Sequence, residues 1–476
     1  MNARIKGRPL RELIPFGREI AIESFACFEG HLEIVYLIDK RFRSLTRIHY
    51  PAGTLASLSR LYAEKELRTL YCQIALFEGL KFCLSFPEVF NVTKIADGLS
   101  PEAFTLFHTL ATNAWAQHIY ENQVEDYFGP ELISDQPLKP TNPKLKLHMN
   151  TGELLCANGG GKDSFLVMKM LEKAKLPYAV FQHARSEYGR FDLQHAIQGR
   201  ILKHLPKTLR EHQISVLDDY TDGTLASFYA PNMVGECIKG NPCQVGWPEM
   251  IFEALPFVLL HGYSGFVLGN ERSADSVQAH WPDQSHRPVN HQWIKSNEAC
   301  KLINHFIQET LIPEFSVFSL LKPIHDQRIY HKLADYPETL SSFHSCNIAK
   351  PWCKKCAKCA YVWANLVAVF GQERVDPIFG VNLFDDPDLE HHWLELLGLS
   401  EHNAFECVGE VWETRLAFYR CVQQGCKGRA ISKFNQAFMG KESPKINWKE
   451  VSDYYNAVHE DHLIPEEIYK RVKGFL

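Results

Sequence analysis

The 476-residue sequence contains no run of about 18 consecutive apolar residues, the length that a membrane-spanning helix requires. Residues 1–11 are basic, but no apolar segment follows them, so we expect no secretory signal peptide. Internal repeats and low-complexity tracts are also missing. Positive charge is not in excess, since 51 Lys and Arg residues face 56 Asp and Glu residues. The composition therefore predicts a soluble globular protein with neither nucleic acid nor a membrane as partner.

Disulfide pairing is not expected, although the chain has 14 cysteines. Most of them are scattered, many within apolar runs such as Ala26-Cys27-Phe28 and Phe82-Cys83-Leu84. Scattered cysteines of this kind are typical of reduced, buried thiols. We therefore expect a cytoplasmic protein.

Four other cysteines form a cluster with the spacing of a metal site. Two Cys-x-x-Cys turns share a cysteine, and the fourth lies a short loop away: Cys346, Cys353, Cys356 and Cys359. Four thiolates at this spacing suit tetrahedral coordination, and Zn²⁺ is the metal that they most often hold. An iron–sulfur cluster is the alternative. Because four protein ligands leave no open position, we expect the site to be structural.

Residues 1–147 are expected to form an N-terminal α+β domain. Apolar residues alternate over 31–39, which predicts a strand, and they recur at helical spacing over 57–86 and 102–123. The Pro-rich segment 135–146 has the composition of a linker. We therefore place a domain boundary there.

Residues 148–345 are expected to form an α/β domain with a parallel sheet. The predicted strands alternate with helical segments, one of which spans 250–263 and is interrupted by Pro256. The strands are predicted at 153–158, 178–182, 213–219 and 265–270. The four-cysteine segment is assigned to 346–390, and a helical C-terminal region to 391–476.

A glycine-rich loop follows the first strand of this second domain. Its residues are Gly159, Gly160, Gly161, Lys162, Asp163 and Ser164, and a helical pattern begins within it. Glycines let a backbone approach a ligand closely, and the start of a helix offers free N–H groups to a phosphate. Ser164 could donate to a phosphate oxygen, and Asp163 could hold Mg²⁺. The Walker A spacing is absent.

The loop resembles that of the PP-loop ATP pyrophosphatases, which split ATP into AMP and pyrophosphate. Gly159 stands where that family has its first serine. The resemblance implies that adenine rests on the next strand, around Phe181. The cysteine cluster resembles that of 7-cyano-7-deazaguanine synthase, another PP-loop enzyme with a four-cysteine zinc site.

Polar residues also gather after the strand at 265–270 and in the segment beyond it. Open parallel sheets bind ligands at the carboxyl ends of their strands, so we expect these side chains to face a ligand. Arg272 and Lys295 could bind carboxylate or phosphate, and His291 could act as a general base. Asn270 and Glu271 complete the set, the latter as a ligand for Mg²⁺ or an ammonium group.

Read together, these segments resemble the MurL family of ATP-dependent UDP-N-acetylmuramoyl-L-alanyl-L-glutamate epimerases. The similarity covers most of the chain from about residue 150 to about 415. It rests on the order of the strings GGGKDS, NERSA, VNHQW-x-K, SLLKP, F-x-SCN, WC-x-x-C-x-KC, IFG-x-NL-x-DD and FECVGE. One departure is Lys354, which stands where we expect a glycine between two cysteines.

The resemblance implies a reaction that inverts the glutamate of UDP-MurNAc-L-Ala-L-Glu while ATP becomes AMP and pyrophosphate. Adenylation would remove the negative charge of the carboxylate and so make the adjacent α-proton more acidic. The glycine loop and Mg²⁺ would position ATP, while Arg272, Lys295 and Lys162 would stabilise charge. His291 is the first candidate for moving the α-proton, and a cysteine is the second.

Other functions remain open from the sequence alone. A related PP-loop enzyme could form an amide or nitrile on a deazapurine carboxylate. A scaffold could bind nucleotide without turnover. Thiolation of tRNA is a third alternative, but it usually needs a basic RNA-binding face, and none is evident. Oligomeric state is not predicted.

Overall fold

The computed structural model describes residues 14–138, 144–222, 246–282, 286–346, 348–401, 404–441 and 445–476. Before residue 14 it describes Glu12 and two short strands, β1 (Arg4–Ile5) and β2 (Arg8–Pro9). The predicted linker 135–146 thus lies partly outside the described residues, as does Asn347 beside the cysteine cluster.

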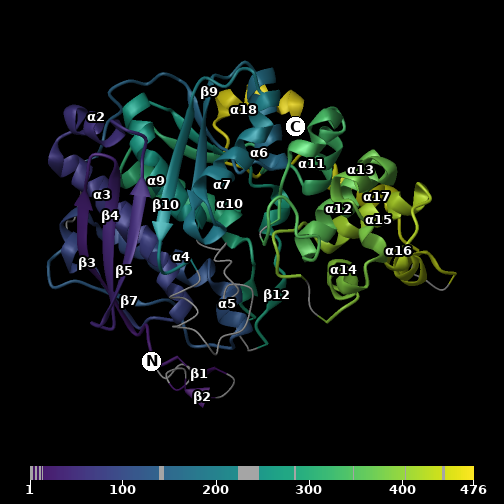
Figure 1. Cartoon of the computed structure of the whole chain (residues 1–476), viewed down its shortest axis with the longest axis horizontal. Coiled ribbons are helices and arrows are strands. Elements are labelled where there is room, and N and C mark those ends of the chain that lie inside the picture. The colour runs from purple at the N-terminus through teal and green to yellow at the C-terminus, as the bar shows by residue number, and fades with distance from the viewer. Residues whose placement is uncertain are drawn as a thin grey trace.

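One ten-stranded sheet forms the centre of the protein (Figure 1). The strands run across it in the order β14-β11-β8-β9-β10-β5-β4-β3-β6-β7. In chain order they are β3 (Glu19–Cys27), β4 (His31–Ile38), β5 (Phe42–His49), β6 (Val89–Asn91), β7 (Glu131–Ile133), β8 (Leu154–Ala157), β9 (Tyr178–Arg185), β10 (Glu211–Asp218), β11 (Gly265–Leu268) and β14 (Ser316–Ser319). A separate hairpin joins β12 (Ala279–His280) to β13 (Pro288–Val289).

The five strands from β14 to β10 are parallel, which confirms the α/β prediction for this part of the chain. All residues of β8 and β11 are buried, as expected for strands that are covered on both faces. In β4, by contrast, fully buried residues alternate with partly exposed ones. This alternation is typical of an antiparallel strand with one face on the core.

The sheet continues across the predicted domain boundary. The last strand of the parallel part, β10, pairs antiparallel with β5, so that Ser215 lies opposite His49 and Asp218 opposite Thr46. β5, β4 and β3 form an antiparallel meander, and β6 and β7 extend it in parallel. The two predicted domains therefore share a single, mostly parallel sheet.

The helices of the first half are α2 (Thr54–Leu61), α3 (Glu64–Glu78), α4 (Pro101–Asn113), α5 (Ala116–Glu121), α6 (Lys162–Lys173), α7 (Phe191–Gln198), α9 (Gly246–His261) and α10 (Asn297–Thr310). The segment predicted as one helix over 57–86 is broken. A new helix begins after Ala63, because the carboxylate of Glu66 accepts from the Ala63 N–H at 2.8 Å. Its last part, Gly79–Ser85, is a 3₁₀ helix. Pro256, in contrast, lies inside α9 without ending it.

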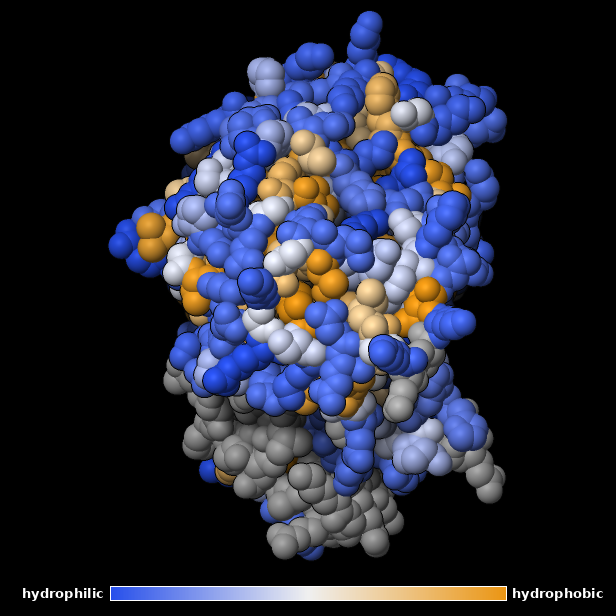
Figure 2. All heavy atoms as spheres, turned by 90° about the vertical axis from the view of Figure 1, so that its right-hand side faces the viewer, coloured by the Kyte–Doolittle hydropathy of each residue, from blue (hydrophilic) through white to orange (hydrophobic). Residues whose placement is uncertain are grey.

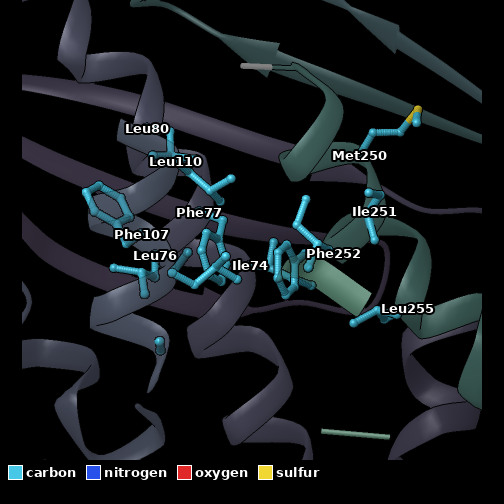
Figure 3. Close-up of a cluster of buried hydrophobic side chains, with 14 of the residues drawn as sticks. Ile74, Leu76, Phe77, Leu80, Phe107, Leu110, Met250, Ile251, Phe252 and Leu255 are labelled. Carbon is cyan, nitrogen blue, oxygen red and sulfur yellow. The ribbon is translucent and has the colours of Figure 1, made fainter. Parts of the chain in front are cut away.

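Helices α3, α4 and α9 meet in an aromatic core, shown in Figure 3. Phe77 of α3 stacks on Phe252 of α9 with ring centroids 4.1 Å apart. Phe107 of α4 packs against Phe77 at 6.5 Å. Since α9 belongs to the α/β part and α3 and α4 to the N-terminal part, this core joins the two.

The C-terminal region is helical, as predicted, and lies beside the parallel half of the sheet (Figure 1). Its helices are α11 (Asp326–Leu333), α12 (Ala357–Phe370), α13 (Gln372–Phe379), α14 (Glu390–Leu396), α15 (Val411–Gln423), α16 (Arg429–Phe434), α17 (Trp448–Tyr455) and α18 (Glu466–Val472). The chain end returns to the sheet, where Arg471 donates to the carbonyls of Ala174 and Lys175 just after α6. Figure 2 shows the face carried by these helices, with hydrophobic side chains interspersed among hydrophilic ones.

Among the described residues, we find no helix with the length and apolar character needed to span a bilayer.

Lys81 holds a buried ionic contact at the junction of the two halves. Its ammonium group contacts Asp218 of β10 and Thr46 of β5, and both charged side chains are fully buried. Burial disfavours both charges, but each compensates the other.

We predict that Lys81→Met lowers the free energy of unfolding by about 3–5 kcal/mol, because it removes the nearer cation from buried Asp218 and leaves only Arg185, 3.9 Å away. Urea unfolding followed by circular dichroism measures this loss. Arg18→Met is the matched control, since Arg18 pairs with Glu88 at the surface and its side chain is 67% exposed. Equal effects of the two substitutions would contradict a special role for the buried contact.

Candidate active site

The glycine loop lies where the sequence predicts it, between the end of β8 and the start of α6. Gly161 is the N-cap of α6, so Lys162, Asp163 and Ser164 occupy the first helical turn. Gly160 has a φ of 75°, and a side chain there would collide with the ring of His344 and the backbone of Gln198. Only glycine fits this position without strain.

Hydrogen bonds hold the loop in a tight curve. The Gly160 N–H donates to Asn158 Oδ1 at 2.8 Å, and the Gly159 N–H donates to Ser164 Oγ at 3.1 Å. Because its oxygen already accepts this bond, the Ser164 hydroxyl proton is available to another acceptor. The loop thus has the form of an anion-binding turn at a helix N-terminus.

The loop forms one wall of a cavity of about 310 Å³ at the carboxyl edge of the parallel strands. Other walls come from the ends of β9 and β11, from α11 and from α12. Of the predicted site residues, the lining includes Gly159, Gly161, Lys162, Asp163, Ser164, Phe181, Asn270, Glu271 and Lys295. The structure therefore brings together most of the residues that the sequence singled out.

Lys162 is the central cation of the cavity. Its ammonium group donates to Asp163 Oδ1 at 2.6 Å and to Asp326 Oδ1 at 2.5 Å, and it lies 4.9 Å from the centre of the Tyr330 ring. Burial acts to lower the pKa of Lys162, but Asp163 and Asp326 raise it well above its usual value. Lys162 therefore remains positively charged at neutral pH.

Three carboxyl groups surround this cation, and their charges affect one another. Burial, opposed in part by Lys162, raises the pKa of Asp326 to about 6. Burial would also raise the pKa of Glu271, but Lys295 and Lys162 lower it overall. The side chain of Asp163 is 30% exposed, whereas that of its ion-pair partner Lys162 is 9% exposed. Asp163 is therefore the more accessible member of the pair.

The cavity is also lined by part of a buried acidic cluster around Arg185, the last residue of β9. Arg185 donates to Glu187 at 3.0 Å, to Glu78 at 3.2 Å and to Glu249 at 2.9 Å. Glu249 Oε1 is buried and has no hydrogen-bond partner within the described chain, although Glu249 lines the cavity. Burial, reinforced by the charge of Glu78, raises the pKa of Glu249 well above its usual range.

Cys407 is a cavity residue that the sequence analysis did not single out. Its sulfur lies 3.5 Å from His291 Nε2, and the other ring nitrogen of His291 is hydrogen-bonded to Gln117. Burial raises the pKa of Cys407, but Lys295, Lys358 and His291 lower it to about 6. Burial lowers the pKa of His291, but Cys407 raises it overall. A thiolate beside an imidazolium is thus favoured near neutral pH.

The sequence contained a signal for Cys407 in the string FECVGE, but nothing in it linked this string to His291. The two residues are 116 positions apart. His291 itself is buried and lies behind Cys407 rather than in the cavity lining.

Arg272 is not among the residues that line the cavity. Its backbone N–H donates to Ile324 O at 2.9 Å, which fixes the residue beside the segment that leads into α11. Burial lowers the pKa values of His325 and His459, and the positive charge of Arg272 lowers both further. Arg272 therefore lies outside the cavity lining, although the preceding residue, Glu271, is part of it.

The four clustered cysteines converge as predicted. Their sulfur atoms all lie within 4.8 Å of one another, with Cys346 and Cys356 3.9 Å apart and Cys353 and Cys359 3.8 Å apart. Cys356 is the N-cap of α12, and its sulfur accepts from the Cys359 N–H. Lys354 has a φ of 65°, a conformation that favours glycine, which explains why a glycine was expected there.

Two parts of the chain match known protein families. Residues 340–447 match the family described as the MurL C-terminal domain, and residues 252–320 match the MurL N-terminal domain. Neither range includes the glycine loop. No solved structure matches the chain.

Three curated relatives share the name UDP-N-acetyl-alpha-D-muramoyl-L-alanyl-L-glutamate epimerase. The relative from Salinispora tropica is 27% identical over 337 residues, which are 67% of this chain and 66% of that protein. The relative from a Micromonospora strain is 27% identical over 339 residues, or 68% and 69% of the two chains. The relative from Xanthomonas oryzae is 29% identical over 227 residues, or 45% and 49%.

The chain thus spans 66% of the length of the first of these relatives, just under two thirds. The two matched domains and the three relatives agree with one another, and they relate this chain to the MurL epimerases.

Proposed function

We propose that this chain epimerises UDP-MurNAc-L-Ala-L-Glu to UDP-MurNAc-L-Ala-D-Glu, a step in peptidoglycan precursor synthesis, and converts ATP to AMP and pyrophosphate. The observation that carries this proposal is the placement of Cys407, held beside His291, in the same cavity as the glycine loop. The relatives named as epimerases of this dipeptide support it. We also propose a cytoplasmic location, with no nucleic acid or membrane as partner.

ATP binding is supported by two chemically different groups in the cavity lining. The N-terminus of α6 and Lys162 suit the phosphates. Glu249 and Glu187 suit the amine and hydroxyl donors of a nucleoside. A neutral carboxyl group at Glu249 could accept from the adenine amine and donate to a ring nitrogen. Phe181 lines the cavity beside the end of β8, where its carbonyl accepts from the Asn158 N–H at 2.8 Å, consistent with the PP-loop resemblance.

Mg²⁺ prefers carboxylate oxygens, and the cavity offers two suitable groups beside the loop. We propose that Asp163 and Glu271 hold the ion, because both line the cavity next to Lys162. The bound ion would offset the charge of the triphosphate.

Activation would begin when an oxygen of the glutamate α-carboxylate attacks the α-phosphorus of ATP and pyrophosphate leaves. The product is an acyl adenylate, in which the carboxylate charge is gone and a carbanion at the α-carbon can be delocalised. Lys162 and Lys295 would stabilise the negative charge of the phosphates and of the transition state. Water would later cleave the acyl adenylate at its carbonyl carbon and release AMP.

The α-proton would move while the adenylate is in place. We propose that the Cys407 thiolate removes it from one face, and that a protonated group returns a proton to the other face. His291 does not line the cavity, so we assign it a positioning role: its imidazolium keeps Cys407 ionised. This assignment shifts the proton transfer from His291, the first candidate from the sequence, to the neighbouring thiol.

We predict that Cys407→Ser separates the two halves of the reaction. Incubated with ATP, Mg²⁺, labelled pyrophosphate and UDP-MurNAc-L-Ala-L-Glu in D₂O, the variant should still exchange the label into ATP. Deuterium incorporation at the α-carbon should fall at least about 100-fold, because a hydroxyl is a far weaker base at neutral pH than a thiolate. The Asp163→Asn variant should lose both activities.

Deuterium incorporation at the normal rate in the Cys407→Ser variant would remove Cys407 from the mechanism. Loss of pyrophosphate exchange in that variant, with its fold intact, would place Cys407 in adenylation instead.

The pH dependence offers a second prediction. Cys407 must be ionised to act as a base, so kcat/KM should fall as the pH drops through about 6, the pKa of this thiol. His291 lowers that pKa, so His291→Asn should move the acidic limb to higher pH. If kcat/KM falls at the same pH in the unmodified enzyme and in His291→Asn, His291 does not lower the pKa of Cys407.

We further propose that the four cysteines hold a structural Zn²⁺. A tetrahedral site with Zn–S bonds of about 2.3 Å places the sulfur atoms about 3.8 Å apart, and the two measured separations are 3.9 and 3.8 Å. The bound ion would fix the loop that carries Cys346 and Cys353 against the start of α12.

Metal analysis of the purified protein should therefore find one zinc per chain and no iron. Cys353→Ser should lose most of the metal, whereas Lys354→Gly should keep it, because glycine adopts the observed backbone conformation without strain. Iron with inorganic sulfide, or less than one zinc per chain, would contradict the proposed zinc site.

The rival functions predict other outcomes. A ligase acting on a deazapurine carboxylate would form AMP only with that substrate and ammonia, and it would invert no stereocentre. A non-catalytic scaffold would bind ATP but form no AMP with any carboxylate. An enzyme that thiolates tRNA would require RNA for turnover.

A further inference from the structure

Three buried nitrogen atoms beside the active-site cavity have no hydrogen-bond partner in the described part of the chain. They are Arg272 Nη1, His325 Nε2 and His459 Nε2. Each comes from a different segment: the loop after β11, the N-cap of α11, and the segment after α17. Buried polar atoms in folded proteins nearly always have a hydrogen-bond partner, so three unpaired nitrogens in one place point to a missing partner.

Backbone contacts bring the three side chains together. The Arg272 N–H donates to Ile324 O at 2.9 Å, and the His459 N–H donates to Pro323 O at 2.9 Å. Both residues are thus fixed against the short segment that ends at His325. The rings of His325 and His459 lie 5.2 Å apart.

Arg272 Nη1 is a donor under all conditions, because a guanidinium nitrogen always carries hydrogen. It therefore directs a buried N–H toward an absent acceptor. His325 Nδ1 lies 3.4 Å from Ser273 Oγ, which also bonds to Glu413. In the tautomer whose Nδ1 accepts from Ser273, His325 Nε2 is a second unpaired donor.

The neighbouring charges do not fill this role. Lys322 is also positive, and its ammonium group is already bonded to Asp275 and to the carbonyls of Glu271 and Lys295. The carboxylate of Glu410 faces the other ring nitrogen of His325, with its Oε1 3.9 Å from Nδ1. The Glu410 oxygens accept from Ser276 and Tyr455, both at 2.6 Å.

We propose that Arg272, His325 and His459 form a binding subsite for an oxyanion of the substrate, next to the adenylation cavity. The position supports this, because Arg272 follows Glu271 and His325 precedes Asp326, and both acidic residues line the cavity. The inference rests on the proposed function for the identity of the substrate. The oxyanion is either the side-chain carboxylate of the glutamate or the diphosphate of the UDP group. Both offer the same acceptor atoms to the subsite.

Calorimetric titration separates the two sources. Arg272→Gln should bind UDP-MurNAc-L-Ala-L-Glu at least about 10-fold more weakly than the unmodified enzyme, since a charge-assisted hydrogen bond is lost. If the subsite binds the glutamate carboxylate, the affinity for UDP-MurNAc-L-Ala should not change. If it binds the diphosphate, the affinity for UDP-MurNAc-L-Ala should fall equally. Arg190→Gln is the control, because Arg190 is 73% exposed and pairs with Asp192.

Unchanged affinity of Arg272→Gln for both compounds would overturn the proposal and leave the three nitrogens to ordered water. A variant that unfolds is recognised by its circular dichroism, and Arg272→Lys then takes its place, with a smaller loss expected.

A second measurement does not depend on the muramoyl substrate. The ring signals of His325 and His459 can be followed by NMR during titration with inorganic phosphate, and His325→Gln and His459→Gln assign them. Bound phosphate should raise both histidine pKa values, because an anion stabilises the imidazolium. No phosphate-dependent shift would contradict the subsite even if epimerase activity is found. A shift without epimerase activity would keep the subsite and reject the proposed substrate.

Discussion

Parallel pairing of β8 with β9 and β11 is the constraint on which the site depends. Because neighbouring parallel strands end at the same edge, the loops that follow them meet there although they are far apart in the chain. The glycine loop follows β8, Arg185 ends β9, and Glu271 follows β11. The C-terminal helices then cover this edge and bring Cys407 into the same cavity. The chemistry is thus assembled by the sheet and completed by the region after it.

Charge compensation explains why so many ionisable groups can be buried together. Lys162 faces Asp163 and Asp326, Arg185 faces Glu78 and Glu249, and Cys407 faces His291. Removal of one member leaves the other buried without its partner, which is unfavourable. The same balance sets the pKa values on which the proposed chemistry depends. In the subsite of Arg272, His325 and His459, the balance is incomplete, and this difference is the basis for inferring a bound anion.

The sequence predicted those parts of the structure that depend on short patterns. Three glycines before a helix predicted the loop, and four cysteines at close spacing predicted a cluster whose sulfur atoms do converge. Alternating strands and helices predicted the parallel strands. The unusual Lys354 was noticed from the sequence, and its left-handed backbone gives the physical reason. Each of these features is determined mainly by neighbouring residues.

Features that arise from distant contacts were not predicted. The pairing of β10 with β5 unites two predicted domains in one sheet, and no local pattern indicates it. Cys407 is one cysteine among 14 until the fold places it beside His291. Arg272 was grouped with the cavity residues because it follows Glu271, but it does not line the cavity, and its charge acts on His325 and His459. Adjacent residues in a loop can face different sites, and only the structure separates them.

The central claim is that the glutamate α-carboxylate is adenylated before its α-proton moves. Transfer of oxygen-18 tests it most directly. The substrate UDP-MurNAc-L-Ala-L-Glu, labelled in both oxygens of its α-carboxylate, is converted with unlabelled ATP in unlabelled water, and the AMP is analysed by mass spectrometry. Attack on the α-phosphorus followed by cleavage at the carbonyl carbon predicts one oxygen-18 atom in each AMP. AMP without the label, formed together with the D-glutamyl product, would contradict an acyl adenylate that is cleaved at its carbonyl carbon.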